Sequence, residues 1–341
     1  MEKGSTSKDF LTKLYNSPDY AELPKKYKEM LATFYQSYAQ SLEENGISFE
    51  PYEKVFHTFL DLFFQQFKSP YHFQPYHQKI RAPFDYYTFG LEFLSPLIDL
   101  KHSKSLGLEH VDEIEAYLKR KDNVILFANH QTEADPHAIS ILLEKTHPQV
   151  GEDMIFVAGA RVTTDLMSIP FSMGCNLLCV YSKKYIDNPP EEKLNKQLHN
   201  KRTMELMNAL LKEGGKCIYV APSGGRDRPN SQGIVELDPF DTSSVEMFYL
   251  MAQKADTGSG HKTHFFPLAL ATYNFIPPPD TIQIELGETR IAQRGPIHLS
   301  FGPELNMETF PGCEETDKHL RRQKRTEYIF NQVNNEYSKI K

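Results

Sequence analysis

The stretch at residues 123–137, NVILFANHQTEADPH, constrains the fold of this chain more than any other. Residues 124–127 form an unbroken apolar run, which is typical of a strand covered on both faces of a sheet. Asp135 followed by Pro136 predicts a helix start, with a capping carboxylate and then a proline at the first helical position. His130 lies between the two elements, so an imidazole and a carboxylate follow the carboxyl end of a buried strand. Open α/β sheets bind ligands at that edge.

Strand-like and helix-like segments alternate from about residue 84 onwards. The predicted strands are 123–128, 155–159, 176–182, 216–221 and 264–272, with 282–288 and 295–304 as a pair near the sheet edge. The predicted helices are 86–100, 111–120, 136–145, 165–174, 190–213 and 314–339. This alternation predicts an α/β fold with a mixed, largely parallel sheet flanked by helices. Pro267, inside one predicted strand, indicates a bulge or an edge strand.

A small helical bundle is predicted to precede the α/β domain. Apolar residues recur at steps of three and four in residues 23–35 and again in 55–63, which is the helical period. Ser17-Pro18, Gly46 and Ser69-Pro70 separate the helices. The proline-rich segment 69–87 is expected to be a linker or a wrapping segment. We therefore place a helical domain at 1–80 and a larger α/β domain at 84–341.

Composition excludes several classes of protein. With 341 residues and a net charge of -7, the chain is not a generic nucleic-acid binder. Its four cysteines form no CxxC pair, which favours a reducing compartment and argues against disulfides and thiolate zinc sites. The histidines show no paired metal spacing, so no metal site is predicted. No apolar run approaches the roughly 18 residues of a membrane-spanning helix. A soluble protein is expected, and peripheral contact with a membrane surface is compatible with this sequence.

Cationic side chains follow three other predicted strands. They are Arg161 after 155–159, Lys183 and Lys184 (with Tyr185 next) after 176–182, and Arg226 and Arg228 in the turn PSGGRDRP. Taken singly, each also fits a solvated loop, and the two arginines of the turn could pair with Asp227 or other acids. Taken together, they lie at one edge of a parallel sheet and suit a phosphate. A histidine base beside a phosphate site predicts a small substrate that carries both a hydroxyl and a phosphate.

The nucleophile is expected to come from that substrate. No G-x-S-x-G elbow accompanies His130, so direct attack by the substrate hydroxyl is favoured over a covalent enzyme intermediate. Asp135 would hold the tautomer of His130 and stabilise the imidazolium as it forms.

Four sequence blocks, in order, resemble the motifs of the glycerolipid acyltransferase superfamily: Asn129-His130-x4-Asp135, FVAGARV, PSGGRDRP and FFPLALA. The longer strings NHQTEADPH, VYSKK, APSGGRDRP and FPLALATYNFIPPP resemble the plastid-type glycerol-3-phosphate acyltransferases and their relatives in chlamydia-like bacteria. The resemblance runs from about residue 84 to the C-terminus, and the helical N-terminal part also fits.

The resemblance implies transfer of a fatty acyl group from acyl carrier protein, or coenzyme A, to the sn-1 hydroxyl of glycerol 3-phosphate. The product would be lysophosphatidate, in the first step of phospholipid synthesis, and no cofactor beyond the acyl donor is implied. His130 would be the general base and Asp135 its orienting partner. The phosphate ligands implied are Lys184, Arg226 and Arg228, with Lys183, Tyr185 and Arg161 as further candidates. Tyr185 replaces a histidine of the family pattern, and a phenol carries no positive charge at neutral pH.

Two further points stay open from the sequence. The basic residues Lys193, Lys196, Lys201 and Arg202 fit either a solvated helix face or a docking site for an acidic acyl carrier protein. Lysophosphatidate or dihydroxyacetone phosphate could be the acceptor, and a non-catalytic lipid or phosphate binder is the alternative from another class. We expect the protein in a bacterial cytoplasm, or in the plastid stroma for a processed plant or algal protein.

Overall fold

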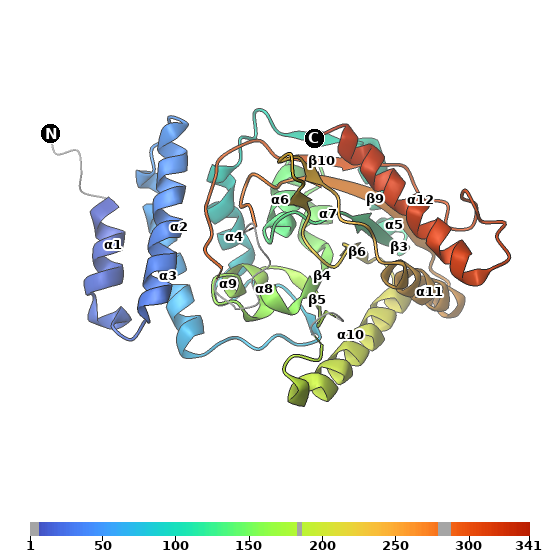
Figure 1. Ribbon diagram of the computed structural model, residues 1–341, viewed down its shortest axis with the longest axis horizontal. Coiled ribbons are helices and arrows are strands. Elements are labelled where there is room, and N and C mark those ends of the chain that lie inside the picture. The colour runs from blue at the N-terminus through green and yellow to red at the C-terminus, as the bar shows by residue number, and fades with distance from the viewer. Residues whose placement is uncertain (1–6, 183–185, 279–287) are drawn as a thin grey trace.

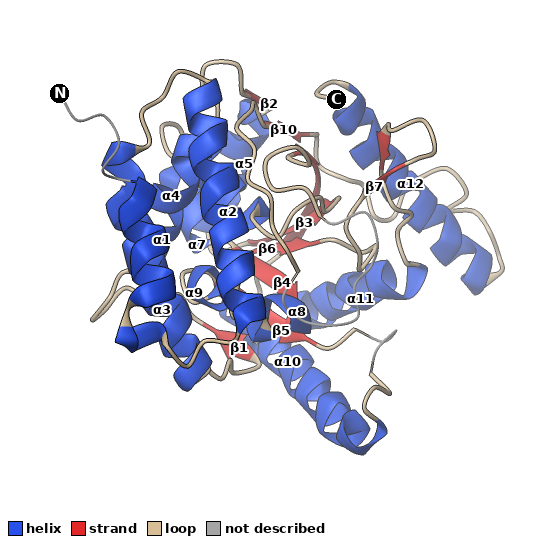
Figure 2. Cartoon of the chain, turned by 60° about the vertical axis from the view of Figure 1, so that its left-hand side comes forward, coloured by secondary structure: helices blue, strands red, loops and turns tan. Residues whose placement is uncertain are grey.

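The structure is a computed structural model that describes residues 7–182, 186–278 and 288–341 (Figure 1). Three helices come first: α1 (Ser7–Asn16), α2 (Lys25–Glu44) and α3 (Glu53–Lys68). Helices α4 (Tyr86–Leu94) and α9 (Ile169–Ser172) lie against them. Figure 2 shows α1 to α4 together on one side of the molecule, with α10 (Lys193–Glu213), α11 (Thr242–Ser259) and α12 (Lys318–Ser338) on the other.

An eight-stranded sheet forms the centre of the described chain, in the order β1-β5-β4-β6-β3-β9-β10-β2. The strands from β5 to β9 are mutually parallel, and β1 and β10 run antiparallel to the neighbours β5 and β9. This confirms the predicted mixed, largely parallel sheet. The strands are β1 (Tyr76–His77), β2 (Lys104–Leu106), β3 (Asn123–Ala128), β4 (Ile155–Gly159), β5 (Asn176–Val180), β6 (Cys217–Val220), β9 (Thr263–Ala271) and β10 (His298–Phe301). A separate small ribbon pairs β7 (Arg228–Pro229) with β8 (Val235–Glu236).

Strand β3 shows why its sequence is apolar at every position. Successive side chains of a strand point to opposite faces. Ile125 and Phe127 pack into the cluster formed with α10, α11 and α12. Val124 and Leu126 pack on the other face, with α5 (Leu108–Lys119), α6 (Asp135–Leu143) and α7 (Pro148–Asp153). Since both faces are covered, the whole strand is buried, and the turn that follows it is held on a rigid element.

The N-terminal helices share a hydrophobic core with residues of the region beyond 84. Phe56 of α3 packs edge-on against Tyr38 of α2 and at a tilt against Phe93 of α4. The same cluster continues into Ala138 of α6 and Phe275, which follows β9. The predicted domain boundary near residues 80–84 therefore stays a prediction. The segments on its two sides share one hydrophobic core.

Several elements differ from the sequence expectations. The expected linker contains β1, which pairs with β5 at the sheet edge. Helix α11 is not among the predicted elements, although Asp241 caps it and Val245, Phe248, Tyr249 and Ala252 lie on its buried face. Of the predicted pair 282–288 and 295–304, the second contains β10, one strand inside the edge because β2 pairs beside it. Residues 279–287 lie outside the described part of the chain.

Pro267 does not mark an edge strand. Strand β9 lies inside the sheet, between β3 and β10. The backbone N and O of one strand residue point to the same side, and the Pro267 carbonyl accepts from Gly302 N, 2.9 Å away. The regular ladder with β10 ends at Leu268, so Pro267, which has no N–H to donate, lies just beyond the end of that ladder.

Candidate active site

His130 and Asp135 form a hydrogen-bonded pair in the turn between β3 and α6. The His130 Nδ1 atom lies 2.8 Å from Asp135 Oδ2. The Asp135 side chain is 1% exposed, whereas that of His130 is 30% exposed. A proton on Nδ1 that is donated to the carboxylate leaves Nε2 as the nitrogen able to accept a proton. The pair therefore has the geometry of a general base with its orienting carboxylate.

Hydrogen bonds from two segments fix the Asp135 carboxylate. The backbone N–H of Gln131 donates to Oδ2 at 2.9 Å, and that of Thr132 donates to Oδ1 at 3.3 Å. The Thr272 hydroxyl, just after β9, donates to Oδ1 at 2.6 Å. The expected capping role is thus corrected: the helix begins at Asp135, but Ala134 holds the cap position, and the carboxylate closes the preceding turn.

The turn at residues 224–228 is bonded directly to the histidine. Asp227 N–H donates to the His130 carbonyl at 2.6 Å. The Asp227 carboxylate accepts from the side-chain amides of Asn129 at 2.7 Å and Gln131 at 3.2 Å. Burial raises the pKa of this carboxyl to about 6, against the opposing effect of these donors. Arg226 and Arg228 flank Asp227 in the chain. The Asp227–His130 hydrogen bond therefore places both arginines beside the turn that contains His130.

Arg226 pairs with Glu288 and not with Asp227. Its Nη2 atom lies 3.0 and 3.1 Å from the two Glu288 carboxylate oxygens. Arg161, which follows β4, is paired with the same carboxylate. Burial lowers the pKa of Arg226, and neighbouring Arg161 and Arg228 lower it further, while Glu133 opposes them. The ends of β4 and β6 thus bring Arg161 and Arg226 together around one buried carboxylate, that of Glu288.

A second buried ion-pair group lies beside the first. Glu133, inside the His-x4-Asp motif, accepts from Arg290 Nη2 at 2.9 Å and from the Ser168 hydroxyl at 2.8 Å. Arg290 also lies 3.3 Å from Asp165. Burial would raise the pKa of Glu133, but the Arg290 charge prevails and lowers it to about 2. This group keeps the turn of the motif attached to α9 and to the segment after residue 288.

The segment 288–294, called the strap here, connects this site with the N-terminal helices. Glu288 and Arg290 enter the two ion-pair groups described above. Farther along, Ala292 N–H donates to the Ser37 hydroxyl at 3.0 Å, and Arg294 N–H donates to the Ser41 hydroxyl at 2.6 Å. Both serines belong to α2. The strap therefore ties α2 to the arginines at the carboxyl edge of the sheet.

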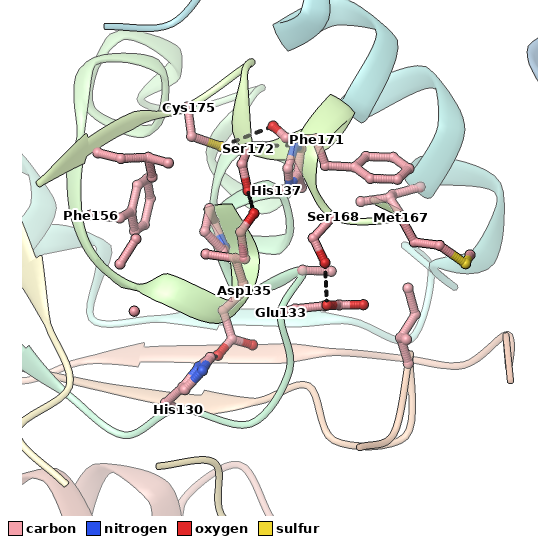
Figure 3. A pocket seen from close by; sticks show the side chains of 18 of the residues that line it. His130, Glu133, Asp135, His137, Phe156, Met167, Ser168, Phe171, Ser172 and Cys175 are labelled. Atoms are coloured by element: carbon pink, nitrogen blue, oxygen red, sulfur yellow. Dashed lines mark hydrogen bonds and ion pairs between the residues drawn. The ribbon is translucent and has the colours of Figure 1, made fainter. Parts of the chain in front are cut away.

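A largely apolar cavity opens at His130 (Figure 3). Its empty space is about 930 Å³, with open solvent at its mouth included. In Figure 3, His130 lies on one side, and the side chains of His137, Phe171 and Cys175 lie on the opposite side. The lining also includes Phe156, Leu177 and Met167. The cavity thus joins a titratable pair at one end to an apolar interior, as in sites for amphipathic ligands.

The other candidate residues are placed as follows. Lys183, Lys184 and Tyr185 lie outside the described residues. Lys193, Lys201 and Arg202 are exposed on α10. Lys196 is only 8% exposed and donates to the Asn188 carbonyl at 2.5 Å, so its assignment to a docking face is wrong. Within the described chain, no group of three His, Cys, Asp or Glu side chains could hold a metal ion.

Sequence reasoning missed the residues that hold the site together: Gln131, Glu133, Asp165, Ser168, Thr272, Glu288 and Arg290. Some signal existed for Gln131 and Glu133, which lie inside the central motif. The sequence holds no such signal for Arg290 and Glu288. Their partners are far away in the chain, and only the fold brings the partners together.

The chain is similar in sequence to known acyltransferases. A sequence model of the family described as Acyltransferase matches residues 110–271. Glycerol-3-phosphate acyltransferase ATS12, chloroplastic, of Cucurbita moschata is 37% identical over 340 residues, which cover 98% of this chain and 72% of that protein. The chloroplastic glycerol-3-phosphate acyltransferase of Arabidopsis thaliana is 35% identical over 336 residues, with 97% and 72% covered.

A solved structure also matches. The 1-acyl-sn-glycerophosphate acyltransferase PlsC of Thermotoga maritima has a TM-score of 0.40 at 17% identity, over 73% of this chain and 78% of that one.

Proposed function

The chain belongs to the family of glycerol-3-phosphate acyltransferases found in chloroplasts and acylates glycerol 3-phosphate, and we propose that His130 is the general base for attack by its sn-1 hydroxyl. The observation that carries this proposal is the Asp227 amide bonded to the His130 carbonyl, because it fixes the arginine-bearing turn beside the base. A substrate phosphate held by Arg226 and Arg228 would present its glycerol hydroxyl near His130. Because the relatives are named as enzymes, family membership argues against the alternative of a non-catalytic lipid or phosphate binder. It also favours glycerol 3-phosphate as the acyl acceptor over lysophosphatidate or dihydroxyacetone phosphate.

The proposed reaction has two proton transfers and no cofactor. His130 Nε2 takes the hydroxyl proton as the oxygen attacks the thioester carbonyl. Asp135 stabilises the resulting imidazolium through Nδ1. When the tetrahedral intermediate collapses, the C–S bond breaks, and the imidazolium gives its proton to the leaving thiolate. No enzyme group is acylated. Arg226 and Arg228 bind the phosphate and neutralise its negative charge.

Substitution of His130 tests the base. We expect His130→Ala to lower kcat by at least about a thousandfold while glycerol 3-phosphate still binds in calorimetry. Arg226→Ala should leave kcat much less affected and raise the KM for glycerol 3-phosphate by about ten- to a hundredfold, since a charge-assisted bond is lost. Wild-type kcat in His130→Ala would refute the mechanism.

We propose that the cavity beside His130 holds the acyl chain. Its lining is apolar, and each methylene buried there contributes roughly 0.8 kcal/mol. Ala158 of β4 lines the cavity at a site where a larger side chain would fill it. Ala158→Leu should lower kcat/KM for long-chain acyl-coenzyme A more than for short-chain donors. An unchanged ratio between the two would show that the chain binds elsewhere.

For the donor we propose acyl carrier protein, docked on the N-terminal part of α10. Leu194 and Leu198 are 65% and 54% exposed on this helix. Lys193, Lys201 and Arg202 surround them, which suits an acidic partner with an apolar patch. Charge reversal of Lys201 and Arg202 should raise the KM for acyl carrier protein about tenfold and leave the KM for acyl-coenzyme A unchanged. Equal effects on both donors would contradict docking here.

The compartment and the membrane remain predictions. The names of the relatives place those proteins in chloroplasts, which supports the plastid stroma over a bacterial cytoplasm. All four cysteines are unpaired in the structure, as either reducing compartment allows. None of the helices in the described ranges has both the length and the hydropathy to cross a bilayer.

A further inference from the structure

Helix α6 places a second histidine in the cavity, two residues after Asp135. His137 is buried, and its ring packs edge-on against Phe171, with the ring centroids 5.9 Å apart. Its Nε2 atom lies 3.9 Å from the Sγ atom of Cys175. Its Nδ1 atom has no hydrogen-bond partner among the described residues. Burial lowers the pKa of the ring to about 4, so the imidazole is neutral at physiological pH.

The far side of His137 is closed by backbone. Gly90 of α4 packs so tightly against the ring that a Cβ atom there would lie 2.5 Å from Nε2 and 2.6 Å from Cδ2. The imidazole thus stands directly between Gly90 of α4 and the cavity. It cannot retreat when a ligand presses on it, because the α4 backbone stands behind it.

We propose that His137, braced by Gly90, is the chain-length stop of the acyl cavity. This inference rests on the proposed acyl site: a chain whose thioester lies at His130 would run toward the side where His137, Phe171 and Cys175 stand (Figure 3). Against an apolar wall, each further methylene of the acyl chain adds binding free energy. Against a neutral imidazole with an unpaired nitrogen it does not. His137 would therefore end the favourable part of the cavity and set the longest acyl chain that binds well.

The test is the acyl-chain profile of purified variants. kcat/KM is measured with acyl-coenzyme A donors from lauroyl to arachidoyl at saturating glycerol 3-phosphate. Each buried methylene contributes about fourfold in kcat/KM. Removing the ring in His137→Ala should make room for roughly two more methylenes. It should raise kcat/KM for the next longer even-numbered chain, relative to that for the wild-type optimum, about fifteenfold.

A variant with the opposite effect checks the bracing. Gly90→Ala must push the ring away from α4 and into the cavity, so its optimum should move to shorter chains. Combined with His137→Ala, the new methyl finds space, and the profile should return toward wild type. His137→Val also removes the unpaired nitrogen and should shift the optimum to longer acyl chains. This variant replaces His137→Ala in the test if the alanine variant does not fold.

His147→Ala is the matched control. His147 is also buried and is bonded to Asp112 at 2.9 Å, but it does not line the cavity, so its profile should be that of wild type. A folded His137→Ala or His137→Val protein with the wild-type chain-length optimum would overturn the inference. If Ala158→Leu changed the profile in the same assay, the acyl cavity itself would still stand.

Discussion

At the scale of single residues, the catalytic pair depends on side chains that never touch the substrate in the proposed mechanism. Asp135 receives one hydrogen bond from His130 and three from donors that hold the carboxylate in place. A hydrogen bond to a buried charge is worth more than one between neutral groups. The Thr272 hydroxyl is the one such donor that can be removed without changing backbone.

Thr272→Val should lower kcat about tenfold, because the loss of roughly 1.5 kcal/mol of support lets the carboxylate turn away from His130. The KM for glycerol 3-phosphate should stay near that of wild type. Steady-state kinetics check this, with Thr326→Val as control, since the Thr326 hydroxyl bonds to the Arg322 carbonyl in α12, away from the site. A kcat equal to that of the control would mean that Thr272 does not position the pair.

Glu288 holds Arg226 and Arg161 at the place where a phosphate is proposed to bind. A substrate dianion must enter against this negative charge. Glu288→Gln should therefore lower the KM for glycerol 3-phosphate roughly three- to tenfold, while lowering the melting temperature. Glu246→Gln breaks a comparable buried contact with Arg325 and Arg322 and should affect stability alone. A raised KM in Glu288→Gln would instead assign the carboxylate an orienting role.

Glu133 should make stability depend on acid pH. Its pKa is lowered from 4.5 to about 2 by Arg290, against the effect of burial. A carboxyl with a depressed folded-state pKa stabilises the fold above its unfolded pKa, and this stabilisation is lost as the pH falls toward about 2. Glu133→Gln should therefore be less stable than wild type by about 3 kcal/mol at neutral pH, with the gap narrowing below about pH 4.5. Urea unfolding over this range measures it, and a constant gap would contradict it.

At the scale of elements, local sequence was sufficient to predict some segments and insufficient for others. The apolar run of β3 and the glycine end of α10 were both predictable from local sequence. The two-residue strand β1 was not, because only its pairing with β5 makes it a strand. The His130–Asp135 pair could be predicted because a single turn contains it. The ion pairs of the strap could not, because Glu133 and Arg290 become neighbours only through the sheet.

The C-terminal ends of α10 and α11 provide a matched pair of glycines, Gly214 and Gly260. Gly214 and Gly260 both have φ of +79°, where a side chain is strained. A Cβ at Gly214 would also lie 2.3 Å from the Lys121 carbonyl oxygen, whereas one at Gly260 would meet nothing within 4 Å. Gly260→Ala should cost about 1 kcal/mol, and Gly214→Ala several kcal/mol. Chemical denaturation compares them, and equal losses would show that the close contact is relieved.

At the scale of the whole molecule, the hydrophobic core crosses the predicted domain boundary. Phe56 and Phe93 lie on opposite sides of it, with ring centroids 4.7 Å apart. We therefore expect a single thermal transition with equal calorimetric and van't Hoff enthalpies. Phe56→Ala should remove about 3–5 kcal/mol and lower the melting temperature of the entire chain. Two separate transitions, with only one shifted in Phe56→Ala, would mean that the N-terminal helices unfold independently.

The order of the strands has a consequence for synthesis on the ribosome. Strand β3 leads into the turn with the proposed catalytic pair, yet its partners β6 and β9 are both translated later. A nascent chain that has just exposed His130 and Asp135 still lacks the Asp227 amide, the Thr272 hydroxyl and the strap. Its titratable pair is therefore present but unsupported until most of the polypeptide has emerged. We therefore expect no acyl transfer by unfinished chains that lack β9 and the strap.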